Sequence, residues 1–428
     1  MCSWSLLNSS IRAATDFCGL EIKPDIGLYP TEATSIQEFP KHKIIENVEI
    51  FHECKFKPKD DAFQDIGESF ERHTIDARQT LGQIALYATA QMAAQFRTHI
   101  FALLIFPGYA RLLRWDRAGV VVTEQIMYDK KCIIPHFYWR YCHASAAERG
   151  LDTSVQPFSG GSNKIRRLLN LEEGDTLFRM SLGVGKGTYI IGKPTYMGVF
   201  SPTGRSTRTF NAVNENDEEE VVFLKDTWRV TEREREHEIY ETLHQNKVRH
   251  IPTVKEGTDI LQHETITNTA ATGWFQGRSF PRIRKFRHYR IVLEEVGHDL
   301  REVGSVRELV TSICDAAEGK SLSAISELTV QVLLFNLYDL AHEDAYRKAG
   351  ILHRDVSVQN ICLLDDGKGL LIDWDMSVST QLPAPNVRHA VEHTVRHDIL
   401  IHEADFWIWE GCMAICGCPL AARSSGPA

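Results

Sequence analysis

The sequence predicts a mixed α+β protein of two or three domains. A chain of 428 residues is long enough for that number at roughly 150 residues per domain. Between residues 71 and 99, apolar side chains recur every three or four positions, which is typical of an amphipathic helix. Short β-rich segments with turn signals surround this helix, at residues 48–57, 98–106 and 111–122. A Ser-Gly-Gly-Ser stretch near residue 160 predicts the first domain boundary.

The composition is that of an ordinary globular protein. Hydrophobic residues make up 43% and charged residues 25%, and the net charge is −9, which makes a nucleic-acid partner a poor first guess. The longest strongly apolar stretch, residues 100–107, is far shorter than the roughly 20 residues that cross a bilayer. The first twenty residues lack the basic and apolar regions of a secretory leader. We therefore expect an intracellular protein, cytoplasmic or nuclear, with no membrane partner.

The ten cysteines do not predict a disulfide framework. Most stand alone among apolar neighbours, where cysteine acts as a small buried hydrophobe. Cys412, Cys416 and Cys418 have a spacing that suggests a metal, but no second pair with zinc-site spacing accompanies them. Isolated cysteines are the favoured interpretation.

A second β-rich region follows residue 160. Its predicted elements are strands at 188–191, 208–213, 221–225 and 289–296 and a charged helix at 231–244. The acidic run at 217–220 is interpreted as a solvated hairpin tip. Residues 327–349 carry helical periodicity, and Gly350 predicts the end of that helix because glycine favours the left-handed C-cap position.

The segment after Gly350 contains the most informative motif. It reads His353-Arg354-Asp355, followed by Asn360, and an acidic pair at Asp373 and Asp375 comes after a β-like run. Phosphoryl transfer needs such groups. One carboxylate orients the attacking hydroxyl, while an amide oxygen and a second carboxylate hold the Mg²⁺ that bridges the nucleotide phosphates. Asn360 follows Asp355 by five positions, and Asp373 follows Asn360 by 13. This is the spacing that such a catalytic loop and metal-binding segment require.

At this point the sequence resembles the fungal-type protein kinase family. The resemblance rests on GILHRDVSVQNI and LLIDWDMS, and on earlier motifs at residues 95–97, 113–117, 204–207 and 224–229. It implies a bilobal protein kinase-like domain that transfers the γ-phosphoryl group of ATP to a Ser or Thr hydroxyl of a protein substrate. The expected organisation is a family-specific α+β domain at 1–160, the kinase N-lobe and hinge at 161–296, and a partial C-lobe at 297–428.

The resemblance also implies roles for single residues. Asp355 would be the catalytic base, and Asn360 and Asp373 would be the metal ligands. Lys225, at the end of an apolar strand, would hold the α- and β-phosphates; a surface lysine is the alternative. Its helical partner would be Glu236, with Glu238 as a competitor.

Two nucleotide-contacting segments are less regular. Leu293, Glu294, Glu295 and Val296 fall where the adenine-binding hinge is expected, although ordinary strand packing would also explain them. Gly204 begins the best candidate for the phosphate-covering turn, and a single glycine there would cradle phosphate only imperfectly.

Three departures from the kinase pattern bear on activity. Ser357 replaces the usual catalytic-loop lysine and no arginine stands at 359, so charge neutralisation must come from elsewhere. Asp375 replaces the glycine of D-F-G, a form closer to small-molecule phosphotransferases. Only residues 374–428 follow Asp373, so we expect a shortened C-lobe, through splicing or gene-model error. A nucleotide-binding pseudokinase or scaffold and a small-molecule phosphotransferase are therefore the alternatives.

A separate motif lies in the N-terminal region. Glu53-Cys54-Lys55 on a predicted strand, followed by a helix with Gln83, resembles the E-x-K element of restriction-endonuclease-like folds. There, acids hold Mg²⁺ and the lysine stabilises an attacking water. No partner acid is identifiable in the sequence, and a solvent-facing E-x-K in a half-buried strand is the alternative.

Overall fold

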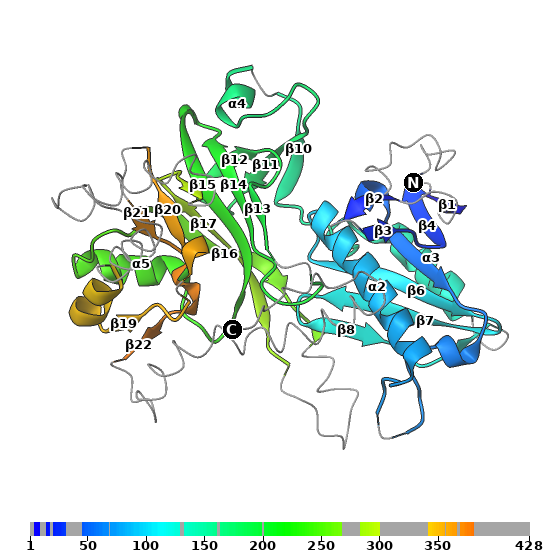
Figure 1. The fold of residues 1–428 in the computed structure, drawn as a ribbon. Coiled ribbons are helices and arrows are strands. Elements are labelled where there is room, and N and C mark those ends of the chain that lie inside the picture. The colour runs from blue at the N-terminus through cyan, green and yellow to red at the C-terminus, as the bar shows by residue number, and fades with distance from the viewer. Residues whose placement is uncertain are drawn as a thin grey trace, which may run out of the picture.

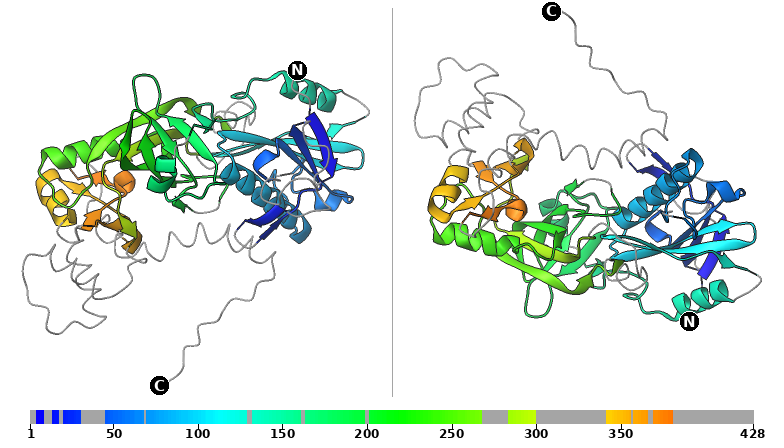
Figure 2. Two further views of the ribbon diagram at one scale, coloured as in Figure 1. Left: turned by 90° about the horizontal axis from the view of Figure 1, so that it is seen from above. Right: turned by 90° about the horizontal axis from the view of Figure 1, so that it is seen from below.

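The computed structural model describes residues 4–8, 14–17, 20–30, 45–67, 69–128, 132–160, 163–198, 201–267, 283–299, 341–355, 357–365 and 369–380. These residues form two large β-sheets with helices packed against them, so the predicted mixed α+β class is confirmed. Figure 1 shows the N-terminal unit (described residues 4–152), in blue and cyan, beside a green eight-stranded sheet. The views in Figure 2 show the same side-by-side arrangement.

The N-terminal unit is built on a seven-stranded sheet. In sheet order its strands are β1 (Trp4–Asn8), β4 (Ile26–Pro30), β5 (Ile50–Cys54), β6 (His99–Phe106), β7 (Tyr109–Asp116) and β8 (Gly119–Val122), with β9 (Ile126–Met127) paired to β7. Strands β5 and β6 are parallel and are joined through helix α2 (Ile75–Ala94), whereas their other neighbours are antiparallel. A small hairpin of β2 (Ala14–Phe17) and β3 (Leu20–Ile22) accompanies the sheet.

Two helices cover opposite faces of this sheet. Phe51 packs with Ile84 of α2, whereas its neighbour Ile50 packs with Tyr141 of α3 (Ile133–His143), because successive strand residues point to opposite faces. The helix predicted at 71–99 is confirmed in type but is shorter. It begins after Thr74, whose Oγ1 accepts a backbone N–H of the first turn at 3.3 Å.

The eight-stranded sheet is antiparallel throughout. In sheet order its strands are β10 (Val155–Phe158), β11 (Leu177–Ser181), β12 (Thr188–Ile191), β14 (Arg208–Asn214), β15 (Asp217–Val230), β17 (Phe286–Leu293) and β16 (Val254–Glu264), with β13 (Tyr196–Met197) paired to β14. The sheet therefore begins slightly before residue 160. The short helix α4 (Asn163–Leu168) follows β10.

The four strands predicted in this region are confirmed, but the hairpin tip is misplaced. The turn falls at residues 215–216, where Asn214 Oδ1 accepts the backbone N–H of Asn216 at 2.9 Å in an Asx-type turn. The acidic run at 217–220 therefore opens strand β15 instead of forming the tip. Helix α5 (Glu236–Gln245) confirms the helix predicted at 231–244, with a later start.

The remaining described elements are short, and several of them share a hydrophobic core with α5. After β17 they are β18 (His298–Asp299), the π-helical turn η4 (Ala345–Ala349), β19 (Ile351–Leu352), the 3₁₀ turn η5 (Val358–Asn360), β20 (Ile361–Leu363), β21 (Gly369–Leu371), the 3₁₀ turn η6 (Trp374–Met376) and β22 (Val378–Ser379). In the N-terminal unit, one more 3₁₀ turn, η2 (Pro58–Asp60), precedes α2. Gly350 ends a helical segment that is described from residue 341, and its φ of 67° is the left-handed cap that the sequence predicted. The earlier part of that predicted helix lies outside the described residues.

Buried ion pairs join the N-terminal unit to the eight-stranded sheet. Arg290 of β17 is fully buried and donates to Asp152 at 2.6 Å and to Asp226 of β15 at 2.8 Å. Asp116 Oδ2 accepts the backbone N–H groups of Ile266 and Thr267 at 2.9 and 3.0 Å. Because charged hydrogen bonds cross the junction inside the protein, the two parts are held in a fixed relation.

Two predictions about the chain as a whole can be compared with the described residues. No helix among them is long and apolar enough to cross a membrane. The described cysteines form no disulfide; they are Cys54, Cys132, Cys142 and Cys362. Cys412, Cys416 and Cys418 lie outside the described residues, as does the segment after residue 380 that bears on a shortened C-lobe.

Candidate active site

A buried histidine shapes the loop that carries Asp355. His353 is fully buried, with Nε2 at 3.0 Å from the carbonyl oxygen of Ile372 and its ring edge-on to Trp374 at a centroid distance of 4.5 Å. The backbone N–H of Asp355 donates to His353 Nδ1 at 3.3 Å. This pattern requires the neutral tautomer with the proton on Nε2, and burial lowers the pKa of His353 accordingly.

The same loop brings Asn360 to Asp355 and Asp373. Asn360 Nδ2 donates to the carbonyl oxygen of Asp355 at 2.7 Å, and the Asn360 carbonyl accepts the N–H of Ile372 at 2.9 Å. Asp373 then adopts a left-handed backbone conformation with φ 66°, which aspartate tolerates better than most residues. Asn360 and Asp373, which are 13 positions apart in the sequence, thus stand at the two ends of one short β-hairpin.

Lys225 is the cation at the centre of the carboxylates. Its Nζ donates to Glu236 Oε2 at 2.7 Å and to Asp373 Oδ1 at 2.5 Å, and it lies 3.6 Å from Asp375 Oδ2. Glu236 is 3% exposed, whereas the competing Glu238 is exposed and pairs with the neighbouring helix cap. Of the two candidate glutamates, the geometry therefore selects Glu236 as the partner of Lys225.

The electrostatics follow from burying these groups together. Burial opposes the charge on Lys225, but Asp373, Asp375 and Glu236 outweigh it and raise the pKa of the lysine. Burial raises the pKa of Glu236 to about 7, and the nearby aspartates add to the shift. In contrast, Lys225 and Arg205 hold the pKa of Asp373 well below its usual range despite burial. Burial, followed by the charge of Asp373, raises the pKa of Asp355.

Three carboxylates here lie close enough to share a metal ion. Oxygen atoms of Glu236, Asp373 and Asp375 are all within 4.8 Å of one another. Oxygen ligands suit a hard divalent cation such as Mg²⁺. Asn360, the other predicted ligand, carries an amide oxygen and lies in the loop of Asp355. The donor set therefore fits the metal that the sequence predicts.

The turn before β14 adds a cation that the sequence analysis did not assign. Arg205 Nη1 contacts both carboxylate oxygens of Asp375, at 2.6 and 2.7 Å, and the Arg205 side chain is 38% exposed. Burial opposes the charge on Arg205, but Asp375 and Asp373 raise its pKa. The only signal available in the sequence was its position next to Gly204.

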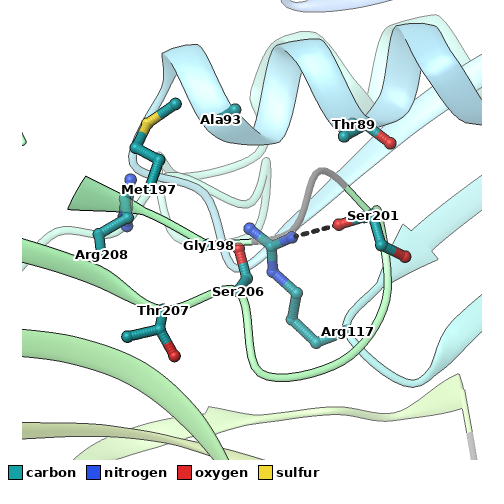
Figure 3. A pocket seen from close by; sticks show the side chains of 9 residues that line it. All are labelled: Thr89, Ala93, Arg117, Met197, Gly198, Ser201, Ser206, Thr207 and Arg208. Carbon is teal, nitrogen blue, oxygen red and sulfur yellow. Dashed lines mark hydrogen bonds between the residues drawn. The ribbon is translucent and has the colours of Figure 1, made fainter. Parts of the chain in front are cut away.

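A residue of the N-terminal unit holds this turn. Gly204, with φ 91°, donates its backbone N–H to the carbonyl oxygen of Arg117 at 2.9 Å. The buried guanidinium of Arg117 donates to the carbonyl oxygens of Ser201 and Pro202 at 3.5 and 3.4 Å, and Figure 3 shows it enclosed by the turn. A small pocket lies beside it, between the turn and α2, but none of the predicted catalytic residues lines that pocket.

The predicted hinge residues lie where β17 ends. Leu293 is buried and pairs with both neighbouring strands. Glu294 is exposed, but its backbone N–H donates to the carbonyl oxygen of Thr253 at 3.0 Å, and Glu295 accepts two bonds from the same threonine. Val296 is half-buried. In this structure the backbone N–H of Glu294 is thus engaged within the protein.

Most of the chain, including all of the site residues described above, matches one known protein family. Residues 61–396 match the family described as fungal protein kinase. The chain belongs to the fungal protein kinase family. For a fungal protein kinase, membership implies phosphotransfer to a protein substrate with ATP and a divalent metal ion. No curated protein matches the chain significantly.

Proposed function

We propose that this fungal protein kinase transfers the γ-phosphoryl group of ATP to a Ser or Thr hydroxyl of a protein, with Mg²⁺ as the metal. The observation that carries the proposal is the buried contact of Lys225 with both Glu236 and Asp373, next to the loop of Asp355. We further propose a bilobal kinase domain, with residues 161–296 as N-lobe and hinge, residues 297–428 as a partial C-lobe, and residues 1–160 as a separate N-terminal domain. An intracellular setting fits this chemistry, because ATP is supplied there.

Each residue has a role in this reaction. The carboxylate of Asp355 orients the acceptor hydroxyl and takes its proton as the oxygen attacks the γ-phosphorus. Asn360 and Asp373 would hold the metal, which when bound neutralises charge on the phosphates. When ATP binds, the ammonium group of Lys225 leaves Asp373 and contacts the α- and β-phosphates. Glu236 remains hydrogen-bonded to that ammonium group and holds it in place. Gly204 covers the phosphates, and Leu293, Glu294 and Val296 flank the adenine.

Arg205 supplies the charge that the catalytic loop lacks. Serine at 357 offers no cation, whereas the Arg205 guanidinium lies on Asp375 inside the acidic cluster. Arginine forks bind phosphate oxygens in the same two-pronged manner as carboxylates. Burial, and to a lesser extent the nearby Arg354, Arg205 and Arg284, lower the pKa of Arg233, whereas Asp375 raises it.

Replacing Asp355 with asparagine is expected to reduce phosphoryl transfer by on the order of 100-fold or more, because an amide takes no proton. Incorporation of labelled phosphate from ATP into a generic protein substrate measures it. Asp365→Asn, a fully exposed acid in the hairpin after the same loop, serves as control and should keep full activity. Equal incorporation by Asp355→Asn and the unchanged protein would contradict the assignment. Stabilisation by ATP without any transfer would instead support a nucleotide-binding pseudokinase.

Replacing Arg205 with methionine is expected to lower kcat/KM for ATP by roughly 10- to 100-fold, the effect of one charged hydrogen-bonding group. Arg205→Lys should recover part of the loss, because it restores the charge without the fork. Arg179→Met removes a comparable partly exposed Arg–Glu pair elsewhere in the sheet and should change nothing. Unchanged ATP kinetics in Arg205→Met would show that the pair with Asp375 is only structural.

A further inference from the structure

Four polar side chains meet in the N-terminal unit, far from Lys225 in the sequence and on a different sheet. Asp25 precedes β4, Glu53 and Lys55 lie at the end of β5, and Gln83 lies on α2. Strand β4 runs antiparallel to β5 with Ile26 opposite His52, so that the chain places Asp25 beside Glu53. Because α2 lies in the connection between β5 and the parallel strand β6 and packs with Phe51, it covers the sheet face to which Glu53 and Lys55 also belong.

The contacts among these residues are specific. Lys55 Nζ donates to Glu53 Oε1 and to Gln83 Oε1, each at 2.7 Å. Gln83 is held in turn by the hydroxyl of Tyr87 at 2.8 Å, and that hydroxyl donates to the carbonyl oxygen of Lys23 at 2.8 Å. Asp25 Oδ2 accepts the backbone N–H of Cys54 at 2.8 Å, which fixes the acid against the strand that carries Glu53.

One carboxylate oxygen in this group has no partner. Glu53 is only 2% exposed, yet its Oε2 is buried without a hydrogen bond, while Oε1 is bound by Lys55. The interpretation of a solvent-facing E-x-K is therefore wrong. Burial and the charge of Asp25 raise the pKa of Glu53 to about 7, although Lys55 opposes the shift. A buried, incompletely paired carboxylate beside a second acid is the environment that a divalent cation would satisfy.

We propose that Asp25, Glu53, Lys55 and Gln83 form a second active site that hydrolyses DNA phosphodiesters with a divalent cation such as Mg²⁺. Asp25 and Glu53 Oε2 would bind the cation, Lys55 would stabilise the attacking water and the phosphate, and Gln83 would orient Lys55. This function is independent of the kinase reaction, since the two sites share no residue. The partner acid missing from the sequence pattern is Asp25, which only the pairing of β4 with β5 reveals.

The reaction consumes water and needs no other reactant. The water oxygen forms a bond to phosphorus, and one P–O bond to a sugar breaks. The proton lost by the attacking water passes to solvent, and the departing sugar oxygen takes a proton from water. The products are a phosphomonoester and a free hydroxyl. Because water is the nucleophile, the reaction does not require a 2′-hydroxyl, so DNA is a competent substrate and is the one that we assign.

Neighbouring exposed side chains suit such a substrate. Phe56, directly after Lys55, is 84% exposed, and Lys23 and Lys57 are also exposed. An exposed aromatic ring offers a surface for stacking on a base, and lysines contact phosphates. A local basic and aromatic surface is compatible with the acidic total charge of the chain.

The test is cleavage of supercoiled plasmid DNA by the purified full chain with Mg²⁺ or Mn²⁺, compared with EDTA. We expect metal-dependent nicking that Asp25→Asn, Glu53→Gln and Lys55→Met each reduce by on the order of 100-fold. Glu53→Gln keeps the shape of the buried side chain, and its melting temperature, measured in parallel, shows that it is folded. The matched control, Asp76→Asn, changes an exposed acid at the start of α2 and should cleave normally.

Asp355→Asn should also retain full cleavage, which separates this site from the kinase site. The proposal is overturned if the unchanged protein cleaves no DNA with either metal, or if Glu53→Gln and Lys55→Met cleave as fast as the unchanged protein, since a contaminating nuclease would then be responsible. Cleavage of RNA alone would overturn the assignment of DNA.

Discussion

Replacing Arg290 with methionine is expected to lower the free energy of unfolding by about 3–5 kcal/mol, the cost of leaving buried charges without their partner. Arg290 is fully buried and donates to four groups: Asp152, Asp226, Ser154 Oγ and the carbonyl oxygen of Ser181. Methionine fills a similar volume but leaves two buried carboxylates short of positive charge. The loss should appear as a lower midpoint in urea unfolding.

The cations next to Arg290 are already engaged, so none of them can take over its contacts with the two carboxylates. His288 Nε2 also contacts Asp226 at 2.6 Å, and Arg208 contacts the other oxygen of Asp226 at 2.8 Å. Asp152, His263 and His288 are close enough to share a metal ion. We interpret them as a charge network instead, because Arg290 and Arg208 already balance Asp152 and Asp226, and a divalent cation would add uncompensated buried charge.

The matched control is Arg287→Met on the same strand. Arg287 is partly exposed and pairs with Glu264 at the surface, so its loss should cost less than about 1 kcal/mol.

The pH dependence of the Arg290→Met effect provides a second check. Despite burial, Arg290 and the adjacent histidines hold the pKa of Asp152 at about 2, below its usual 3.8, so its stabilising contribution is present above pH 4 and is lost as the pH falls toward 2. The difference between Arg290→Met and the unchanged protein should shrink over that range; a constant difference would contradict this account.

Much of the kinase-like region could be predicted because its signals are local. Gly350 marks a helix end through its own backbone preference, and the intervals between Asp355, Asn360 and Asp373 reflect one short loop and hairpin. Strand alternation and turn residues located β12, β14 and β17 within a few residues. The acidic run was misplaced because charge pattern does not specify a turn, whereas the Asx bond of Asn214 does.

The parts that could not be predicted depend on contacts between distant segments. Arg205 reaches Asp375 across 170 positions, and Asp25 meets the end of β5 across 29 positions. Neither pairing leaves a periodic or compositional trace, because the sheet register and the packing of distant segments decide it. The choice of Glu236 over Glu238 is of the same kind. Both lie in one charged helix, and only the packing of α5 on Lys225 buries the first.

Replacing Lys225 with methionine is expected to affect catalysis and stability together. Phosphoryl transfer should fall by on the order of 100-fold or more, because the role proposed for Lys225 is to hold the α- and β-phosphates. The same change removes the ammonium group that lies between Glu236 and Asp373. Glu236 already has a pKa of about 7 with Lys225 present, and the loss of the lysine raises it further.

The stability effect of Lys225→Met should therefore depend on pH with a defined sign. Above pH 7 Glu236 is driven toward its charged form without a partner, and we expect a loss of about 3–5 kcal/mol at pH 8. At pH 5.5 Glu236 binds a proton in the folded state, so the loss should be clearly smaller, as urea unfolding at the two pH values would measure. Lys255→Met, which removes a partly exposed lysine paired with Glu220 on β15, should show little loss at either pH. An equal loss of unfolding free energy for Lys225→Met at both pH values would contradict this account. It would mean that lost packing, and not the uncompensated charge of Glu236, destabilises the variant.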